Sequence, residues 1–380
     1  MIKIKIEFFG RARLIADHFS DDVLRQYPNV DDVTAYVHGT GCGMADSGEG
    51  FEALQRVMWG YAKNPNVVGV LMVGLGCEMN QISWLVEAYG LKTGPLFQTM
   101  NIQDMAGTRR TVEKGIQKIS DMLPLANQST RVICSASGLV VALQCGGSDA
   151  WSGITANPAL GYACDLLVSH GGTGVLAETP EIYGAEHMLA RRAVSTDVGK
   201  KLIAKVKWWE NYTKINGASM DNNPAPGNKK GGLTTILEKS LGAVAKGGKS
   251  NLIDVIDYGE ILQKKGFNFM NSPGFDPVSV TGQVASGANI ICFTTGRGSC
   301  FGFKPVPSIK IATNTNMYNR MKEDMDINSG TIMDGLETVE ENGIKIYKNI
   351  IEVASGKKSK SEINGYGDDE FNPWVIGATL

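Results

Sequence analysis

Three cysteines stand where a short apolar run ends in a glycine-rich turn. They are Cys42, Cys77 and Cys145, which follow runs over residues 33–38, 67–74 and 138–143. Short runs rich in β-branched residues and flanked by turn formers predict buried strands. Open α/β sheets bind ligands beyond the carboxyl ends of their strands. A single cysteine is usually a small buried hydrophobe, but the threefold repetition predicts that these thiols hold a metal in one pocket.

The loop 144–158 after the third run is rich in glycine and hydrogen-bonding side chains. We expect it to join a strand to a helix over 158–169, with Asn157 as the N-cap and as a candidate substrate ligand. Such a helix start offers free N–H groups to an anion. Ser148 is a further candidate substrate ligand, and Asp149 is a candidate ligand or proton acceptor.

A second set of acidic residues follows the run 174–177. Glu178 stands at the predicted strand end, where a carboxylate is placed for metal binding or proton transfer. Glu181 has an alternative role, since an acid in the first turn of a helix offsets the helix dipole. His187, on the following predicted helix, is a candidate for proton transfer or a structural histidine.

The segment 221–232 combines two prolines, three asparagines, two lysines and several glycines. This composition predicts a rigid clamp for a polyhydroxylated anion, with Asn223, Asn228 and Lys230 as substrate ligands. Lys229 is predicted to neutralise a carboxylate or to serve as the base. Arg297, between glycines after another apolar run, is a natural bidentate partner for a carboxylate.

Composition excludes several classes of protein. Of 380 residues, 43% are hydrophobic and 20% charged, and the net charge is −2, as in a soluble globular protein that has neither a nucleic acid nor a membrane as partner. The seven cysteines show no short disulfide-like spacing, and no signal peptide is apparent, which predicts a cytoplasmic location. The segment 246–250 has lysines and glycines like a P-loop, but Ala243 replaces the required first glycine.

Strand-like and helix-like segments alternate along the chain, which predicts an α/β fold with parallel sheets and helices on their faces. We place the domains at 1–127 and 128–380, with the second one catalytic. The predicted strands are 33–38, 67–74, 138–144, 174–177, 288–294 and 308–312. The predicted helices are 21–27, 49–61, 81–89, 111–122, 158–169, 183–193, 197–213 and 233–244.

Several linked motifs resemble the altronate dehydratase and galactarate dehydratase family. They are the segments 39–44, 73–78, 144–149, 152–158, 178–187, 226–233, 294–298 and 324–328. The resemblance runs from about residue 11 to the end, and segments 178–187 and 365–374 are closer to the altronate branch. It implies two Rossmann-like parallel-sheet domains, one of which takes part in forming a homodimer. It also implies an iron-dependent hydro-lyase that converts a sugar acid to a 2-keto-3-deoxy acid.

Two departures from the family are expected to matter. This sequence lacks the small SAF domain that family members carry, and we expect a separate small SAF-domain subunit to supply it, as in the related sulfolactate sulfo-lyase. Residues 1–10 do not resemble the family's first strand, but they alternate like a strand that replaces a lost edge. The alternative functions are therefore a large subunit of a sulfo-lyase that releases sulfite, or an inactive sugar-acid-binding subunit.

For a dehydratase of this family, a divalent metal stabilises the charge that forms when a proton leaves the carbon beside a carboxylate. We expect Fe²⁺ to be held by Cys42, Cys77 and Cys145, with an iron–sulfur cluster on the same thiols as the alternative. Arg297 and Lys229 are expected to hold the carboxylate. Asp149, Glu178 or His187 would then transfer the proton.

Overall fold

The computed structural model describes residues 3–7 and 11–377, and the chain divides into two compact units. The first unit is Met1–Ile133 with Phe371–Leu380, and the second is Cys134–Glu370. The division falls a few residues after the predicted boundary at 127. The C-terminal segment, which we expected in the second domain, instead returns to the first unit, where Phe371 packs edge-on against Tyr61 with ring centroids 4.9 Å apart.

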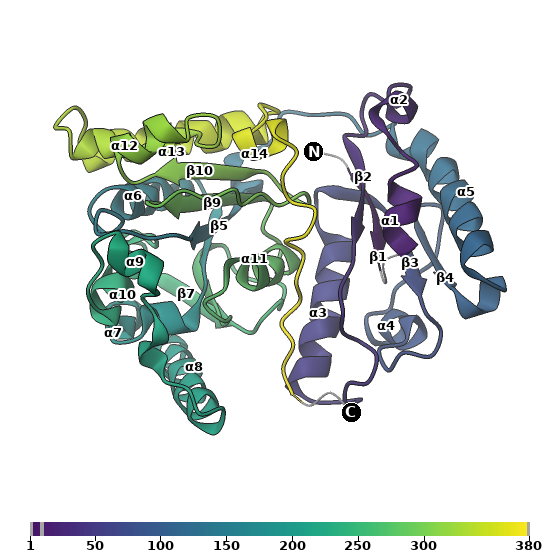
Figure 1. The fold of residues 1–380 in the computed structure, drawn as a ribbon, viewed down its shortest axis with the longest axis horizontal. Helices are drawn as coiled ribbons and strands as arrows, with labels where there is room; N and C mark the ends of the chain where they lie inside the picture. The colour runs from purple at the N-terminus through teal and green to yellow at the C-terminus, as the bar shows by residue number, and fades with distance from the viewer. Residues whose placement is uncertain (1–2, 8–10, 378–380) are drawn as a thin grey trace. The chain divides into compact units, whose positions relative to one another are not determined.

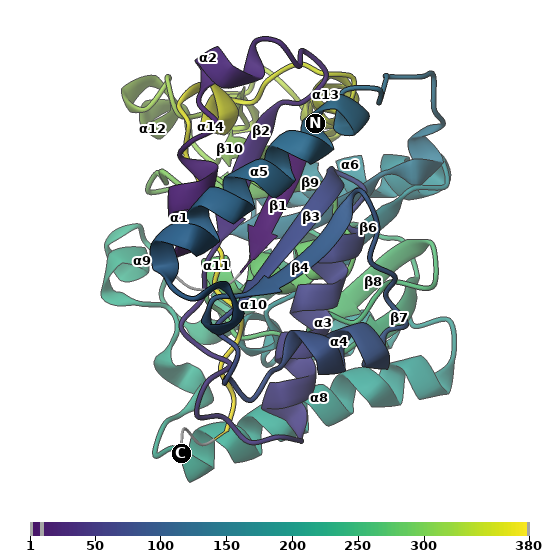
Figure 2. The ribbon, with the colours of Figure 1, turned by 90° about the vertical axis from the view of Figure 1, so that its right-hand side faces the viewer.

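The first unit is built on a parallel sheet of order β2-β1-β3-β4 (Figures 1 and 2). Its elements are β1 (Lys3–Glu7), α1 (Arg11–Ala16), α2 (Asp21–Leu24), β2 (Asp32–Tyr36), α3 (Glu49–Lys63), β3 (Val67–Gly74), α4 (Ile82–Ala88), β4 (Phe97–Asn101) and α5 (Thr108–Ala126). Strand β1 pairs with both β2 and β3. The N-terminal segment is therefore a strand, but it lies inside the sheet and not at its edge as expected.

Helices cover both faces of this sheet, and the side chains of each strand point alternately to one face and the other. In β3, Leu71 and Val73 pack in one core with α1 and α5, whereas Val70 and Met72 pack in another with α3 and α4. An eight-residue run that is apolar on both faces is typical of a strand buried in a parallel sheet. Because residues on both faces of β3 are buried, its sequence is a continuous apolar run.

The second unit is built on a larger parallel sheet of order β11-β10-β9-β5-β6-β8-β7. Its strands are β5 (Val140–Cys145), β6 (Thr173–Leu176), β7 (Leu252–Ile256), β8 (Gly266–Met270), β9 (Ile290–Thr295), β10 (Ser308–Ala312) and β11 (Ile327–Asn328). Its helices are α6 (Ala156–Ser169), α7 (Glu186–Ala190), α8 (Thr196–Ile215), α9 (Pro226–Lys230), α10 (Ile236–Ala245), α11 (Asp276–Ala285), α12 (Thr315–Arg320), α13 (Val339–Ala354) and α14 (Lys360–Ile363). The parallel sheets confirm the predicted α/β class.

The order of strands in the second sheet creates one topological switch point. The chain first runs from β5 to β6 on one side and later reaches β9 on the other side of β5. Ligands of open α/β sheets bind outside the carboxyl ends of the strands at such a point. Within the described chain, no helix is both long and apolar enough to cross a bilayer.

Strand β5 is fixed on both faces. On one face Leu143 belongs to a core shared with α6, α10 and α13. On the other face the buried Gln144 amide donates to Ser279 Oγ at 2.7 Å and to Gln283 Oε1 at 2.8 Å, both on α11. Both hydrogens of the Gln144 amide group are thus used in contacts with one helix, which fixes the orientation of this side chain. These contacts hold the last residue of β5, Cys145, in a defined position.

Candidate functional site

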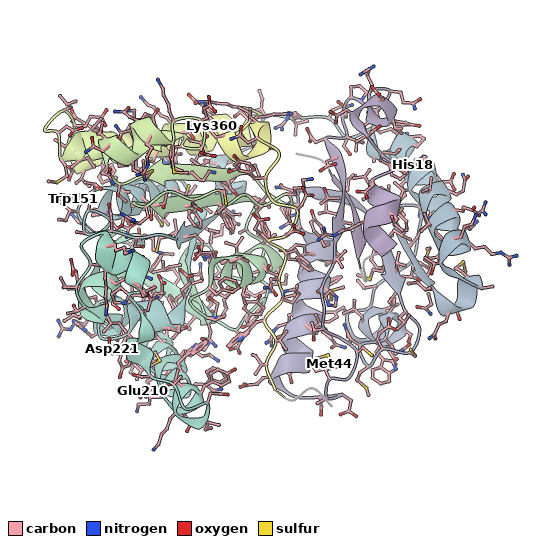
Figure 3. All side chains as sticks on the ribbon, viewed as in Figure 1. His18, Met44, Trp151, Glu210, Asp221 and Lys360 are labelled. Carbon is pink, nitrogen blue, oxygen red and sulfur yellow. The ribbon has the colours of Figure 1, made fainter. Side chains whose placement is uncertain are left out.

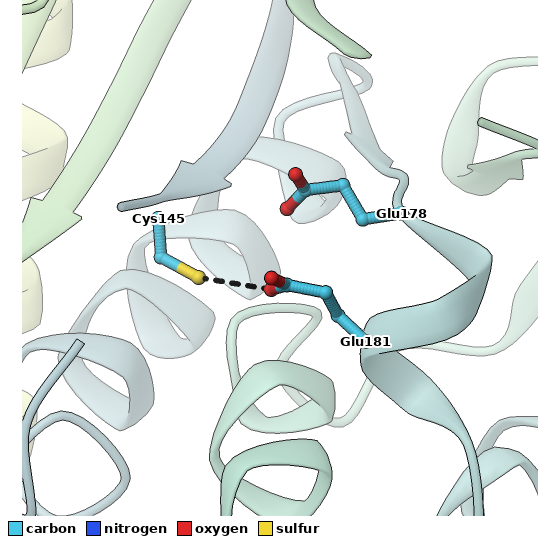
Figure 4. Close-up of side chains that lie close together, drawn as sticks. All are labelled: Cys145, Glu178 and Glu181. Atoms are coloured by element: carbon cyan, nitrogen blue, oxygen red, sulfur yellow. Dashed lines mark hydrogen bonds between the residues drawn. The ribbon is translucent and has the colours of Figure 1, made fainter. Parts of the chain in front are cut away.

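Three potential metal ligands converge at the carboxyl ends of β5 and β6 (Figure 4). Cys145 ends β5, Glu178 follows β6, and Glu181 lies in the short 3₁₀ turn Thr179–Ile182. One ligand atom from each residue lies within 4.8 Å of the other two, and all three side chains are buried. The Cys145 Sγ contacts Glu181 Oε2 at 3.5 Å. We name these three residues the Cys-Glu-Glu cluster.

The register of the sheet brings the cluster together. Strands β5 and β6 are parallel neighbours in which Leu143 faces Leu176, so the segments that follow them leave the sheet side by side. Glu178 adopts a left-handed backbone with φ of 71°. Such a conformation in a residue with a side chain costs roughly 1–3 kcal/mol and persists only where the surroundings impose it. Here Ser272 imposes it, since its Oγ accepts from Glu178 N and its carbonyl accepts from Thr179 N, both at 3.0 Å.

The carboxylate of Glu178 has an unusual environment. The residue is 1% exposed, and neither carboxylate oxygen accepts a hydrogen bond from any described residue. Burial first, and the neighbouring Glu181 second, raise the pKa of Glu178 well above its usual value. A buried polar group without a partner needs an explanation, and a bound ion is one. Strain and an unpaired carboxylate at one residue both indicate a functional site.

Two lysines from the segment around α10 supply positive charge. Lys239 forms a buried ion pair with Glu181, and Lys246 Nζ donates to Cys145 Sγ at 2.9 Å. Asn223 Nδ2 also donates to Glu181 Oε1 at 3.0 Å. Burial alone would raise the pKa of Glu181, but Lys239 and Lys246 outweigh it and lower that pKa. Burial likewise opposes the charge on each lysine, yet the acidic neighbours raise both lysine pKa values.

The protonation states give a direct test of whether the cluster fits a divalent metal. Burial raises the pKa of the Cys145 thiol to about 11, and burial together with the charge of Glu181 raises the pKa of the Glu178 carboxyl well above its usual value, so both groups favour their protonated forms. A divalent ion that displaced both protons would find three anionic ligands and leave the net charge of the buried site unchanged. The donor set of one thiolate and two carboxylates therefore fits such an ion electrostatically.

Asp276, the first residue of α11, extends the acidic site. Its pKa is raised to about 7, chiefly by burial and then by the charge of Glu181. Its carboxylate packs against the backbone of Gly146, where an added Cβ would lie 2.2 Å from Asp276 Oδ2 and 2.5 Å from the Phe293 ring. A side chain at position 146 would therefore force the side chains of Asp276 and Phe293 to move.

We expect the substitution Gly146→Ala to destabilise the protein by about 2 kcal/mol, because an overpacked core must shift its neighbours. The matched control is Gly138→Ala, since a Cβ at Gly138 would meet no atom within 4 Å. Urea unfolding of the two variants measures the difference. Equal stabilities would show that the backbone beside Cys145 is not held against Asp276.

A second group of predicted residues gathers at the switch point between β5 and β9. Asp149 is buried, and its carboxylate accepts from Ser152 Oγ at 3.0 Å, Thr313 Oγ1 at 2.9 Å and Asn314 Nδ2 at 3.0 Å. Its Cγ would lie only 2.0 Å from a Cβ added to Gly296. Asp149 therefore ties the loop after β5 to the loop after β10.

The segment around α9 folds onto the same loop. Asn228 Nδ2 donates to the Ser148 carbonyl at 2.9 Å, and Ala150 N donates to the Gly231 carbonyl at 3.0 Å. A Cβ at Gly231 would lie 3.1 Å from Arg297 Cδ, so Arg297 borders this segment. The basic heads of Lys229, Lys230 and Arg297 are exposed, and none has a partner among the described residues. This edge of the sheet therefore offers unpaired cations.

The remaining predicted residues lie elsewhere. His187 is exposed on α7, outside the Cys-Glu-Glu cluster. Asn157 is not the helix cap that we expected, because α6 begins at Ala156 with Thr155 before it. Its amide instead donates to the Gly242 carbonyl at 2.9 Å and accepts from Thr294 Oγ1 at 2.6 Å.

The other two cysteines belong to the first unit. Cys42 and Cys77 are exposed, and their loops meet where Asn80 N donates to the Gly41 carbonyl at 3.1 Å. Gln103 Nε2 donates to Cys77 Sγ at 3.1 Å. The metal-ligand group in the described chain contains Cys145 alone of the three thiols, together with glutamates.

Sequence reasoning missed Lys239, Lys246 and Asp276, and favoured no single role for Glu181. The two lysines are seven residues apart, a spacing that puts side chains on the same face of a helix. That spacing was the available signal, but lysine is rarely fully buried without a partner, and the partners come from other elements.

Family models agree with this architecture. The model "D-galactarate/Altronate dehydratase, C-terminal" matches residues 136–379, and the model "D-galactarate dehydratase/Altronate hydrolase, second domain" matches residues 9–127. The two matches correspond closely to the sheet-based units, with the C-terminal segment as the difference.

Several curated proteins are similar. The chain is 44% identical to galactarate dehydratase (L-threo-forming) of Escherichia coli over 80% of this chain and 59% of that protein. It is 36% identical to altronate dehydratase of Bacillus subtilis, over 92% and 69%. It is 31% identical to (2R)-sulfolactate sulfo-lyase subunit beta of Chromohalobacter salexigens, over 82% and 80%. The chain thus spans about three fifths of the length of the first relative. On these matches, it belongs to the D-galactarate/altronate dehydratase family.

Proposed function

We propose that this protein removes water from a sugar acid to give a 2-keto-3-deoxy acid. The observation that carries the proposal is the buried Cys-Glu-Glu cluster, with its unpaired Glu178 carboxylate at the carboxyl edge of a parallel sheet. The names of two relatives, galactarate dehydratase and altronate dehydratase, support the reaction class. Such a reaction takes a proton from C2, expels the C3 hydroxyl as water, and ends when the enol tautomerises to the keto acid.

We propose that Cys145, Glu178 and Glu181 hold one divalent metal, with Fe²⁺ as the candidate. When bound, such a metal acts as a Lewis acid that stabilises negative charge on the substrate. A mononuclear site is supported because an iron–sulfur cluster draws on several thiolates, and this group contains one. The ion pair of Lys239 with Glu181 and the contact of Lys246 with Cys145 orient two of the ligands.

The cations at the switch point are proposed to bind the substrate carboxylate. Lys229 lies on α9, and Arg297 lies on the loop after β9 that borders the end of this helix. Guanidinium groups suit planar carboxylates. We propose Asp276 for proton transfer, because a carboxyl group with a pKa of about 7 both accepts and donates protons at neutral pH. Asp149 is occupied by hydrogen bonds and His187 is exposed on α7, which makes them weaker candidates.

Metal affinity should rise with pH. Because burial raises the pKa of both Cys145 and Glu178, a metal must compete with protons for these ligands, and affinity increases up to about tenfold per pH unit for each proton released. Anaerobic calorimetry with Zn²⁺ or Fe²⁺ between pH 6 and 8, in buffers of different ionisation enthalpy, counts these protons. The Glu178→Gln variant should release one proton fewer. An affinity independent of pH would contradict the assignment.

An activity assay tests the reaction class. Protein purified anaerobically with Fe²⁺ is given altronate, galactarate or (2R)-sulfolactate, and keto acid and sulfite are both measured. Keto acid from either sugar acid is the expected result. Sulfite instead would assign a sulfo-lyase activity, for which the relative named as a sulfo-lyase subunit gives the precedent. We propose a homodimer and a small SAF-domain partner, so the assay is repeated with that polypeptide. If neither keto acid nor sulfite forms from any of the three substrates, with or without the SAF-domain polypeptide, the proposal is overturned.

A further inference from the structure

A small cavity lies in the second unit beside the switch point. Its volume is about 170 Å³, and its lining includes Trp151, Thr315, Asn316, Met333 and Asp334. These residues come from the segments that follow β5, β10 and β11. Because the strands are parallel, all three segments leave the same edge of the sheet. Trp151 is at the surface of the unit, 41% exposed (Figure 3).

The lining combines an apolar wall with a few polar groups. Trp151 and Met333 offer exposed apolar surface, whereas Asn316 and Thr315 offer hydrogen-bonding groups. Asp334 carries the negative charge of the cavity and accepts a hydrogen bond from Thr315 Oγ1. Ligand sites combine an apolar surface with a few placed polar groups, and this cavity has both at a size that suits part of a small molecule. A polyhydroxylated carbon chain would suit the apolar wall and the polar groups alike. Its C–H groups would contact the indole of Trp151, and its hydroxyls would form hydrogen bonds with the amide of Asn316 and the carboxylate of Asp334.

The cavity adjoins the unpaired cations. Asp149 binds Asn314, a lining residue, and the neighbouring Ala150 N donates to the Gly231 carbonyl at the end of α9. At the end of α12, Arg320 Nη2 donates to the Arg297 carbonyl at 3.3 Å. Basic residues thus lie on segments that contact the loop carrying Trp151, and the acidic Asp334 lines the cavity. No described lysine or arginine forms an ion pair with Asp334.

This charge arrangement favours a ligand with one anionic end and one neutral end. We propose that the cavity binds the hydroxylated tail of an aldonate, whose carboxylate is held by Arg297 and Lys229. Asp334 is the specificity-determining residue, because it repels the second carboxylate of an aldarate. This inference rests on the proposed dehydratase function and names its substrate class: one carboxylate, as in altronate, and not two, as in galactarate.

The test compares kcat/KM for altronate and galactarate in wild-type protein and in Asp334→Asn. Asparagine keeps an acceptor for Thr315 and removes the charge. We expect wild type to prefer altronate, and Asp334→Asn to shift the ratio about tenfold towards galactarate, since like charges brought together in a recognition site disfavour the wrong partner. The matched control is Glu323→Gln, which likewise replaces a carboxylate by an amide, at an exposed position outside the cavity. Its ratio of kcat/KM for the two acids should equal that of wild type.

Two further measurements separate a charge effect from a structural one. The shift should shrink in concentrated salt, because salt screens a charge at a partly exposed site. Trp151→Ala should raise KM for altronate about tenfold, whereas Trp151→Phe, which keeps an aromatic ring, should have a KM close to that of wild type. A ratio that does not move in Asp334→Asn would overturn the inference.

Direct binding keeps the inference testable if no turnover is found. Calorimetry with altronate and with galactarate on the same variants, without metal, should show the same change in preference. If wild type turns over neither acid but Asp334→Asn shifts the binding ratio, the proposed function fails and the pocket stands. If turnover is found and neither ratio shifts, the function stands and the inference fails.

Discussion

Replacing Glu178 by glutamine is expected to lower dehydration activity about 100-fold or more while the protein stays folded. Loss of groups that merely support a metal ligand already costs about 10- to 100-fold, and Glu178 is proposed as a ligand itself. The fold should tolerate the change, because burial raises the pKa of the carboxyl group and so favours its neutral form, and no described residue donates a hydrogen bond to it. Glutamine has nearly the same shape, so the free energy of unfolding should change by less than about 1 kcal/mol.

Steady-state kinetics with saturating Fe²⁺, together with urea unfolding, measure both parts of this prediction. Glu323→Gln serves as the control for the loss of an exposed acid, with activity and stability unchanged. Activity within a factor of ten of wild type would remove Glu178 from the site. A variant that fails to fold would show instead that the residue is structural.

Lys239→Met is expected to give the largest loss of stability, about 3–5 kcal/mol. Breaking a buried ion pair leaves its partner charged and uncompensated, and Glu181 is 4% exposed. For a unit of this size the melting temperature should fall by about 10 °C. Lys249→Met is the matched control, since Lys249 is exposed a few residues further along the chain. Calorimetric melting of both variants provides the comparison.

The sign of the pH dependence follows from Glu181. Its pKa is lowered in the folded protein, so the pair contributes stability above the unfolded pKa and loses it as pH falls through the folded value. The difference in the free energy of unfolding between wild type and Lys239→Met should therefore be largest at pH 7 and should disappear at acidic pH. The double variant Lys239→Met, Glu181→Gln should recover most of the loss, because no unpaired charge remains. A double variant as unstable as the single one would contradict the pairing.

Local patterns predicted the main architecture. The alternation of apolar runs and amphipathic segments identified β3, β5, β9 and α3 to within a few residues, and with them the α/β class. Strand β4, with the sequence Phe-Gln-Thr-Met-Asn, has too few apolar residues for the pattern to show. The start of helix α13 is marked in the sequence, because Thr338 and Glu341 form a capping box.

The site was predicted only in part, because its residues come from several strands. The sequence pattern predicts strand ends at Cys145 and Glu178, and in the structure Cys145 ends β5 and Glu178 follows β6. A pattern of this kind does not say which strand ends are neighbours in the sheet. Within the second unit, the neighbours of Cys145 are glutamates from the segment after β6 and lysines from around α10. Burial of Lys239 and Lys246 depends on acids that are distant in sequence, which no local pattern reveals.

The relatives of this chain are named for two different sugar acids. The chain is 44% identical to a galactarate dehydratase and 36% identical to an altronate dehydratase. We propose that the acidic residue in the Trp151 cavity favours a substrate with one carboxylate. The Asp334→Asn comparison therefore tests which of the two substrate classes this chain prefers.

X-ray absorption at the iron edge of anaerobically loaded protein tests the central claim most directly. A metal held by Cys145, Glu178 and Glu181 should show one sulfur ligand among oxygen ligands and no neighbouring iron. The sulfur contribution should disappear in Cys145→Ser. Iron bound without sulfur, several sulfur ligands, or an iron–iron distance typical of a cluster would contradict the account.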